Sequence, residues 1–107
     1  MKIKCYMSSR RGTFDAQAII NEDNTITVMK GSVISKEISE NLKVAKAVKA
    51  NREDKTIVDE NCTLLKDVTF KSLSTAAQFI NGRSTNGYVA WKVDNNMTVK
   101  DYLMDKE

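Results

Sequence analysis

Residues 70–93, FKSLSTAAQFINGRSTNGYVAWKV, decide the fold of this chain, because they predict a short helix, a tight turn and a strand in succession. Ser72 can cap the first helical turn with its hydroxyl, and Asn81-Gly82 supplies a left-handed stop at the other end. The apolar residues between them recur at the spacing of one helical face: Leu73, Ala76, Ala77 and Ile80. This half of the segment therefore predicts a helix with one apolar face.

The second half of the segment predicts a turn and a strand. Residues 83–87 form a polar elbow, in which Asn86-Gly87 suits backbone angles with φ above zero. Residues 88–93 then alternate between two faces. One of these faces carries Val89, Trp91 and Val93. We expect the helix to fold back onto this strand.

Length and composition indicate one small domain, residues 1–107. The chain has 107 residues, is 41% hydrophobic and contains no proline, so we expect one modest core. No run approaches the roughly 18 apolar residues of a membrane span, and the first residues lack the apolar centre of a secretory signal. We therefore expect a cytoplasmic protein.

The lack of histidine narrows the chemistry of the chain. Histidine is the commonest general base and the commonest metal ligand, and the sequence has none. Cys5 and Cys62 are far apart, so zinc binding and a disulfide framework are poorly supported, and buried reduced thiols are expected. No motif suggests an activated serine or cysteine. We expect no enzyme activity, no metal and no cofactor.

Alternating apolar residues predict strands before the opening segment. An initial strand carries Ile3, Cys5 and Met7 on one face. A second strand carries Phe14, Ala16, Ala18 and Ile20 on one side. Residues 21–24 form a polar turn, after which Ile26 and Val28 begin the return strand of a hairpin. Residues 57–58 and 63–65 predict a second, shorter hairpin around a turn at 59–61.

A lysine-rich helix is predicted between the two hairpins. Its apolar arc consists of Ile38, Leu42, Val44, Ala45 and Val48. Arg52 and Lys55 would rotate into that arc if the helix continued. We therefore expect the helix to end near Ala50 or Asn51.

A short C-terminal helix completes the predicted elements. Thr98, with Asp101 three residues later, resembles a capping box at its start. Together the elements predict an α+β domain, in which antiparallel hairpins form a sheet packed against two or three short helices.

Charge is unevenly distributed along the chain. The formal net charge is +3, from 17 basic and 14 acidic residues. The basic residues that precede any acidic one are Lys2, Lys4, Arg10 and Arg11. A second basic set, opposed only by Asp67, is Lys66, Lys71, Arg83 and Lys92. This distribution favours a basic face toward a polyanion, with an ordinary solvated surface as the alternative.

Separated blocks of the sequence resemble one known family. TVMKGS at residues 27–32 and the stretch DVTFKSLSTAAQFINGRSTNGYVAWKV at residues 67–93 resemble the domain of unknown function 4357 family. The family pattern runs approximately VLKGS, an arginine in a helix, D-x-x-F-x-SPS-x-AA, GRS-x-NG and W-K. The matching residues are Lys30, Gly31, Ser32, Asp67, Phe70, Ser72, Ser74, Ala76, Ala77, Gly82, Arg83, Ser84, Asn86, Gly87, Trp91 and Lys92, and with looser spacing Arg52. Leu73 stands where the family has proline, and leucine also suits that helical position.

The resemblance implies an accessory role in DNA metabolism. Family members look like accessory domains, often placed after GIY-YIG nuclease segments or near restriction and modification proteins. The segment is also similar to RAMA (restriction enzyme adenine methylase associated) domains, for which binding of modified DNA has been proposed. The chain has no GIY or YIG segment, so we expect a freestanding accessory module. The expected function is non-enzymatic DNA binding beside a nuclease or methyltransferase partner, and the competing expectation is a protein interaction or assembly domain.

The expected DNA contacts lie on the polar side of the elbow and in the basic segments. They are Arg83, Lys92, Ser72, Ser74, Ser84, Asn86, Lys71, Arg10 and Arg11. Arg83 and Lys92 would contact phosphate, and the helix start at residues 72–75 would offer N–H groups to an anion. Arg83 has a structural alternative, in which it bonds the exposed helix carbonyls. Trp91 is expected in the core, with stacking on an extruded base as its alternative.

Overall fold

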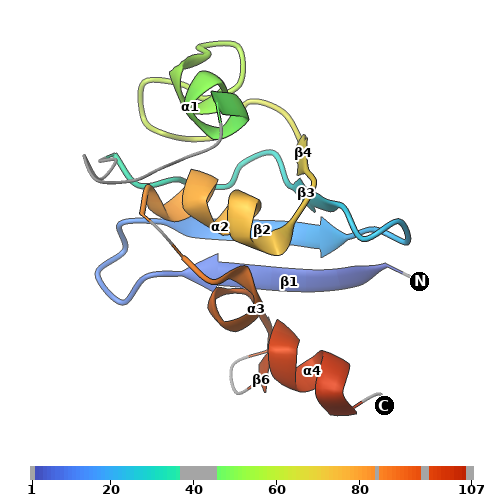
Figure 1. The fold of residues 1–107 in the computed structure, drawn as a ribbon. Helices are drawn as coiled ribbons and strands as arrows, with labels where there is room; N and C mark the ends of the chain where they lie inside the picture. The colour runs from blue at the N-terminus through green and yellow to red at the C-terminus, as the bar shows by residue number, and fades with distance from the viewer. Residues whose placement is uncertain (1, 37–45, 84, 95–96, 106–107) are drawn as a thin grey trace.

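The computed structural model describes residues 2–36, 46–83, 85–94 and 97–105, which form an α+β fold around one antiparallel sheet (Figure 1). The strands are β1 (Ile3–Ser8), β2 (Asp15–Ile20), β3 (Ile26–Val28), β4 (Val68–Phe70), β5 (Lys92–Asp94) and β6 (Met97–Thr98). Their order across the sheet is β4-β3-β2-β1-β5-β6. The helices are α1 (Lys46–Glu53), α2 (Leu73–Asn81), α3 (Gly87–Ala90) and α4 (Val99–Asp105). Within these residues, no helix is long and apolar enough to cross a membrane.

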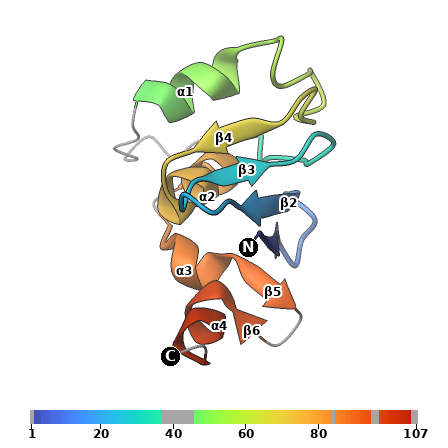
Figure 2. The ribbon, with the colours of Figure 1, turned by 90° about the vertical axis from the view of Figure 1, so that its right-hand side faces the viewer.

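The described helices lie toward one face of the sheet and leave the other face open (Figure 2). The strands alternate to suit this arrangement, because Cys5 and Met7 are buried while Tyr6 between them is exposed. On the open face, Tyr6 pairs with Gln17 of β2 and with Lys92 of β5. The buried residues of α2 are Leu73, Ala76, Ala77, Phe79 and Ile80. The core therefore lies between the sheet and α2.

The predicted first strand and hairpin are confirmed by β1, β2 and β3. Ile20 pairs with Ile26 across the β2–β3 turn. The shorter hairpin is reduced to a single antiparallel bridge between Val58 and Leu64, with Asp59 holding the turn through its carboxylate. Strand β4 lies outside the predicted strands, although its three residues alternate between buried and exposed positions.

Both ends of α2 confirm the predicted capping. Ser72 Oγ accepts a hydrogen bond from Thr75 N at 3.1 Å. Gly82 has φ of 74°, and its N–H donates to Gln78 O at 2.8 Å. The predicted C-terminal helix is also confirmed, since Thr98 Oγ1 accepts from Asp101 N at 3.1 Å at the start of α4.

The predicted turn and strand after α2 are partly wrong. Residues 87–90 form α3, a single helical turn, and the strand β5 begins only at Lys92. Asn86 caps α3 from an extended conformation, with Oδ1 accepting from Tyr88 N at 3.0 Å. Val89 is consequently 46% exposed instead of buried. A short alternating run fits one helical turn followed by a short strand as well as it fits a continuous strand.

Gly87 is required for a close approach and not for a positive φ. A Cβ atom at this position would lie 2.2 Å from the carbonyl carbon of Leu73. The start of α3 thus packs directly on the backbone at the start of α2. Trp91 follows α3 into the core with 0% exposure, and its Nε1 donates to Leu73 O at 3.1 Å. The core interpretation of Trp91 is confirmed.

The lysine-rich helix extends further than expected. Its predicted first half falls on residues 37–45, which lie outside the described part of the chain. Helix α1 ends at Glu53 and not near Ala50 or Asn51. The expected end rested on Arg52 rotating toward the apolar side, and Arg52 does turn inward. There its guanidinium donates to the carbonyl oxygens of Ser35 and Phe79. A helical wheel of α1 alone cannot show these partners.

Candidate functional site

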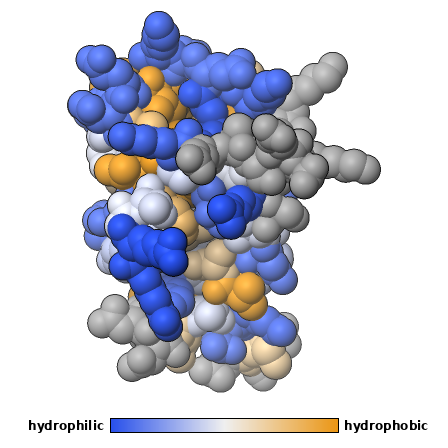
Figure 3. Space-filling model, turned by 90° about the vertical axis from the view of Figure 1, so that its left-hand side faces the viewer, coloured by the Kyte–Doolittle hydropathy of each residue, from blue (hydrophilic) through white to orange (hydrophobic). Residues whose placement is uncertain are grey.

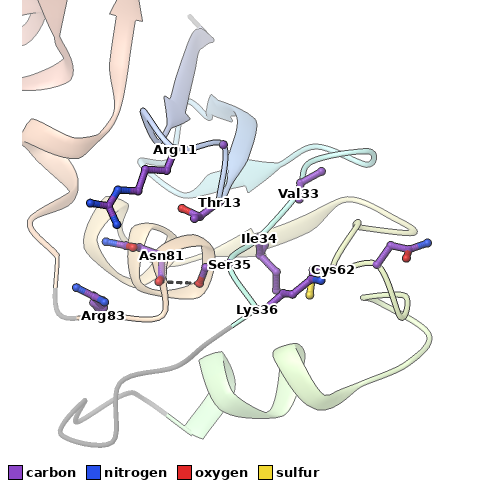
Figure 4. A pocket seen from close by; sticks show the side chains of 11 residues that line it. Arg11, Thr13, Val33, Ile34, Ser35, Lys36, Cys62, Asn81 and Arg83 are labelled. Carbon is purple, nitrogen blue, oxygen red and sulfur yellow. Dashed lines mark hydrogen bonds between the residues drawn. The ribbon is translucent and has the colours of Figure 1, made fainter.

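A cavity of about 650 Å³ opens between the β1–β2 loop and the C-terminal end of α2 (Figure 4). It is lined by Arg11, Gly12, Thr13, Val33, Ile34, Ser35, Lys36, Asn61, Cys62, Asn81 and Arg83. The two arginines and Asn81 lie on one side of the cavity, and Val33, Ile34 and Cys62 lie on the other. The cavity therefore has a cationic end and a more apolar end.

The C-terminal end of α2 forms one wall of this cavity, and its last four carbonyls all have partners. Gly82 N bonds Gln78 O, Arg52 bonds Phe79 O, and Ser35 N bonds Ile80 O. Ser35 Oγ then donates to Asn81 O at 2.7 Å. Terminal carbonyls of a helix usually need water or capping groups. Here the hydrogen bonds from Ser35 fix the backbone beside Lys36 against the start of the loop that carries Arg83.

The β1–β2 loop is held just as firmly over the cavity. Ser9 Oγ accepts hydrogen bonds from Thr13 N at 2.7 Å and from Thr13 Oγ1 at 2.8 Å. Asp15 and Val33 exchange two backbone hydrogen bonds, of 2.9 and 2.7 Å. The loop is therefore tied both to itself and to the apolar wall, which positions Arg11 at the rim.

The charged residues among the described lining of the cavity are all basic. They are Arg11, Lys36 and Arg83, all exposed, and the described lining includes no aspartate or glutamate. Among the described residues, no hydrogen bond or ion pair engages the guanidinium of Arg83. Its structural alternative, bonding to the end of α2, is therefore not realised. The C-terminal end of α2 points toward the molecular face shown in Figure 3, and hydrophilic side chains cover much of that face.

The negative end of the α2 dipole points toward the cavity, which by itself disfavours an anion. Arg52 offsets this field, because its guanidinium sits on the terminal carbonyls. Burial lowers the pKa of Arg52, yet an arginine stays protonated at neutral pH. A fourth positive charge therefore lies behind the end of α2, although Arg52 is not among the residues that line this cavity.

A second cavity of about 210 Å³ adjoins the first on the α1 side. The two share Ile34, Ser35, Lys36 and Cys62. Cys62 is half-buried with φ of 61°, whereas Cys5 is fully buried beneath the sheet. Burial raises the pKa of the Cys5 thiol to about 12. Within the described residues, no group of three or more His, Cys, Asp or Glu side chains is arranged to hold a metal ion.

The structure brings two of the predicted contact residues together and disperses the others. Arg11 and Arg83 share the cavity. Arg10 is exposed in the same loop but does not line the cavity, and Lys71 is exposed between β4 and α2. Lys92 lies on the open face of the sheet beside Tyr6.

The predicted polar contacts at the elbow are engaged in internal hydrogen bonds. Ser72 and Asn86 act as helix caps, and Ser74 Oγ accepts from Gly87 N at 3.0 Å. The first N–H groups of α2 are thus partly used by the cap. Ser84 lies outside the described residues. Lys36 was missed, because a lysine outside any motif carries no signal until the fold places it.

Other residues of the recognised pattern also have structural duties. Asp67 Oδ1 accepts a hydrogen bond from Lys30 N at 2.7 Å, which holds the turn after β3. Gly31 has φ of 91°, a conformation that favours glycine. Ser32 is buried and its Oγ bonds the backbone of Gln17. Most of the pattern therefore encodes the fold, which leaves the exposed cations as candidates for function.

One family model matches the chain, whereas individual known proteins do not. No curated protein and no solved structure matches the chain. The family model described as Domain of unknown function (DUF4357) matches residues 5–103, nearly the whole chain. The chain therefore belongs to the DUF4357 family.

Proposed function

We propose that this chain is a non-enzymatic DNA-binding module, whose primary contacts are made by Arg11, Lys36 and Arg83. The observation that carries the proposal is that these three cations line one cavity, in which the described lining residues include no acidic one. Arginine and lysine side chains at a rim are suited to phosphate oxygens. The resemblance noted in the sequence supports an accessory role beside a nuclease, restriction or methyltransferase protein.

Salt dependence of DNA binding tests the proposal. A short fluorescent DNA duplex is titrated with the protein at several salt concentrations, and binding is followed by anisotropy. Each phosphate contact should steepen the plot of log affinity against log salt by about 0.9. Arg83→Ala and Arg11→Ala should each make that slope shallower by about 0.9, the value for one phosphate contact. No binding at low salt would overturn the proposal.

Arg10→Ala is the matched control for Arg11→Ala, because the two residues are neighbours in one loop and only Arg11 lines the cavity. The control should keep more of the affinity and slope than Arg11→Ala. Arg83→Ala should leave the melting temperature almost unchanged, since no described residue bonds its guanidinium. Equal losses for Arg10 and Arg11 would indicate diffuse attraction instead of a site.

A second candidate function is protein interaction or assembly, which one observation favours. The neighbouring helices α3 and α4 expose four large apolar side chains: Tyr88, Val89, Leu103 and Met104. Exposed apolar residues on adjacent elements are typical of interaction surfaces. Light scattering over a range of protein concentrations distinguishes the candidates, because self-assembly raises the mass with concentration and DNA binding by a monomer does not.

A further inference from the structure

We infer that the cavity accepts a single unstacked nucleotide, with its phosphate between Arg11 and Arg83 and its base toward Val33, Ile34 and Cys62. The inference rests on the proposed function for the claim that the nucleotide belongs to DNA. The cavity volume of about 650 Å³ lies within the range of roughly 300–1,000 Å³ that small-molecule sites occupy. Contacts between the rim cations and the phosphates of an intact duplex would not need a cavity of this volume.

The two ends of the cavity match the two ends of a nucleotide. Arg11 and Arg83 lie at one end, and the aliphatic side chains of Val33 and Ile34 lie at the other. Lys36 adds a positive charge along the wall. An inorganic anion would use only the first end, whereas a nucleotide would fill both.

Two amide side chains line the cavity. Asn61 precedes Cys62 and is exposed, and its side-chain amide forms no hydrogen bond with the described residues, so it can hydrogen-bond the polar edge of a base. Asn81 lies on the side of the arginines. Its Nδ2 donates to Thr85 Oγ1 at 3.2 Å, which leaves Oδ1 as an acceptor for the sugar. The described lining residues include no aromatic ring, so the base would lie against the aliphatic side chains of Val33 and Ile34.

The source of the nucleotide follows from the cost of extrusion. Removing a base from an intact duplex costs a few kcal/mol, and the cost is least where the base is mismatched, damaged or already single-stranded. We therefore expect the cavity to favour such DNA over intact duplex.

The affinity for free ligands tests the inference directly. Deoxynucleoside 5′-monophosphates, 2-deoxyribose 5-phosphate and inorganic phosphate are compared by isothermal titration calorimetry. At least one deoxynucleotide should bind roughly tenfold more tightly than deoxyribose phosphate, because only the nucleotide reaches the apolar end. Equal affinities for the three probes, or no binding of any nucleotide, would overturn the inference.

Alkylation of Cys62 supplies a second test that leaves the rim cations intact. N-ethylmaleimide is expected to modify Cys62 and spare the buried Cys5, which intact mass verifies. The modified protein should lose nucleotide affinity roughly tenfold and keep its circular dichroism spectrum. Cys62→Ser protein is the matched control, because it cannot be alkylated at this position and its own nucleotide affinity, measured before and after the same treatment, should not change. Unchanged nucleotide binding after complete alkylation would place the base outside this cavity.

The two proposals fail in different ways. If duplex binding is present and deoxynucleotides bind no better than deoxyribose phosphate, the nucleotide pocket is wrong and the DNA-binding function stands. If deoxynucleotides bind in the cavity but no DNA binds at low salt, the proposed function is wrong and the pocket serves a free nucleotide.

Discussion

The guanidinium of Arg52 donates a hydrogen bond to the carbonyl oxygen of Ser35 at 2.6 Å. The same guanidinium also bonds Phe79 O in the last turn of α2. Arg52 thereby joins α1, the segment after β3 and the end of α2 at one point. Its position in the family pattern is thus explained by a structural duty.

Arg52→Ala should destabilise the protein by roughly 3 kcal/mol, because it removes charged hydrogen bonds and leaves partly buried carbonyls without a donor. Urea denaturation measures this change. Lys49→Ala is the matched control on the same helix, because Lys49 is exposed, and it should cost less than about 0.5 kcal/mol. A loss for Arg52→Ala as small as the control would show that water replaces the guanidinium without penalty.

Gly87→Ala and Gly31→Ala should separate steric from conformational roles of glycine. A Cβ at Gly87 would meet the backbone of Leu73 and Ser74 at 2.2 to 2.4 Å, so α3 would have to move away from α2. We expect a loss of at least about 3 kcal/mol. Gly31 has open space around it and φ of 91°, so its substitution should cost only roughly 1–2 kcal/mol. Thermal melts of both variants measure these two losses of stability. A larger loss for Gly31→Ala than for Gly87→Ala would contradict the steric role of Gly87.

The contrast between these glycines shows what the sequence could predict of the fold. Local signals predicted α2 correctly, because the capping of Ser72 and the left-handed Gly82 depend on neighbouring residues alone. The Asn86-Gly87 pair carries the same kind of local signal, but Gly87 serves a contact with the backbone of Leu73. A contact between backbone segments that are distant in the chain leaves no local pattern in the sequence. The sequence therefore predicted a turn and a strand where the structure has the helical turn α3.

Trp91→Ala should cost about 3–5 kcal/mol of stability, since the side chain is completely buried. Trp91→Phe should cost less than Trp91→Ala, because a six-membered aromatic ring remains, although the hydrogen bond from Nε1 to Leu73 O is lost and a cavity replaces the pyrrole part of the indole. Urea denaturation of both variants provides the measurement. A stable Trp91→Ala protein would contradict the packing role.

The candidate site was less predictable than the fold. The pattern of charge drew attention to Arg11 and Arg83, which do share a cavity. It could not separate them from Arg10 and Lys71, because exposure and charge are the same for all four. Only the hydrogen bonds that fix the β1–β2 loop and the end of α2 decide which cations converge. Lys36 enters the site for the same reason.

Stability at acid pH should depend on Asp54. The Thr56 side chain and backbone N–H donate to Asp54 Oδ1 at 2.6 and 2.8 Å. These bonds, led by the one from the hydroxyl, lower the pKa of Asp54 below its ordinary value of 3.8. Because the folded pKa is the lower one, the stabilisation is present above pH 3.8 and is lost as pH falls through the folded pKa.

Thr56→Val removes the larger of these two effects and keeps the side-chain shape. We expect a small loss of melting temperature above pH 3.8 that shrinks as the pH falls below it. Glu53→Gln, at an exposed neighbour on α1, is the control for a general charge effect. A loss that grows toward acid pH would mean that the Asp54–Thr56 bonds favour the protonated carboxyl, contrary to the assignment.

The two cysteines should differ sharply in reactivity in the native protein. Cys5 is completely buried beneath β1, which lies between β2 and β5 in the sheet, and its pKa is raised to about 12, so very little thiolate forms even in mildly alkaline solution. Cys62 is half-buried in the lining of the cavity. A thiol reagent should therefore label one site in the native protein and both in denaturant, as intact mass and peptide mapping would show.

Raising the pH toward 9 should leave Cys5 protected, because the pKa of the Cys5 thiol remains far above that pH. Cys62→Ser protein should consequently resist the reagent until it unfolds, so the labelling rate of that variant reports opening of the core. Rapid native labelling of Cys5 would mean that the sheet opens locally between β1 and its neighbours, at a free-energy cost well below that of global unfolding.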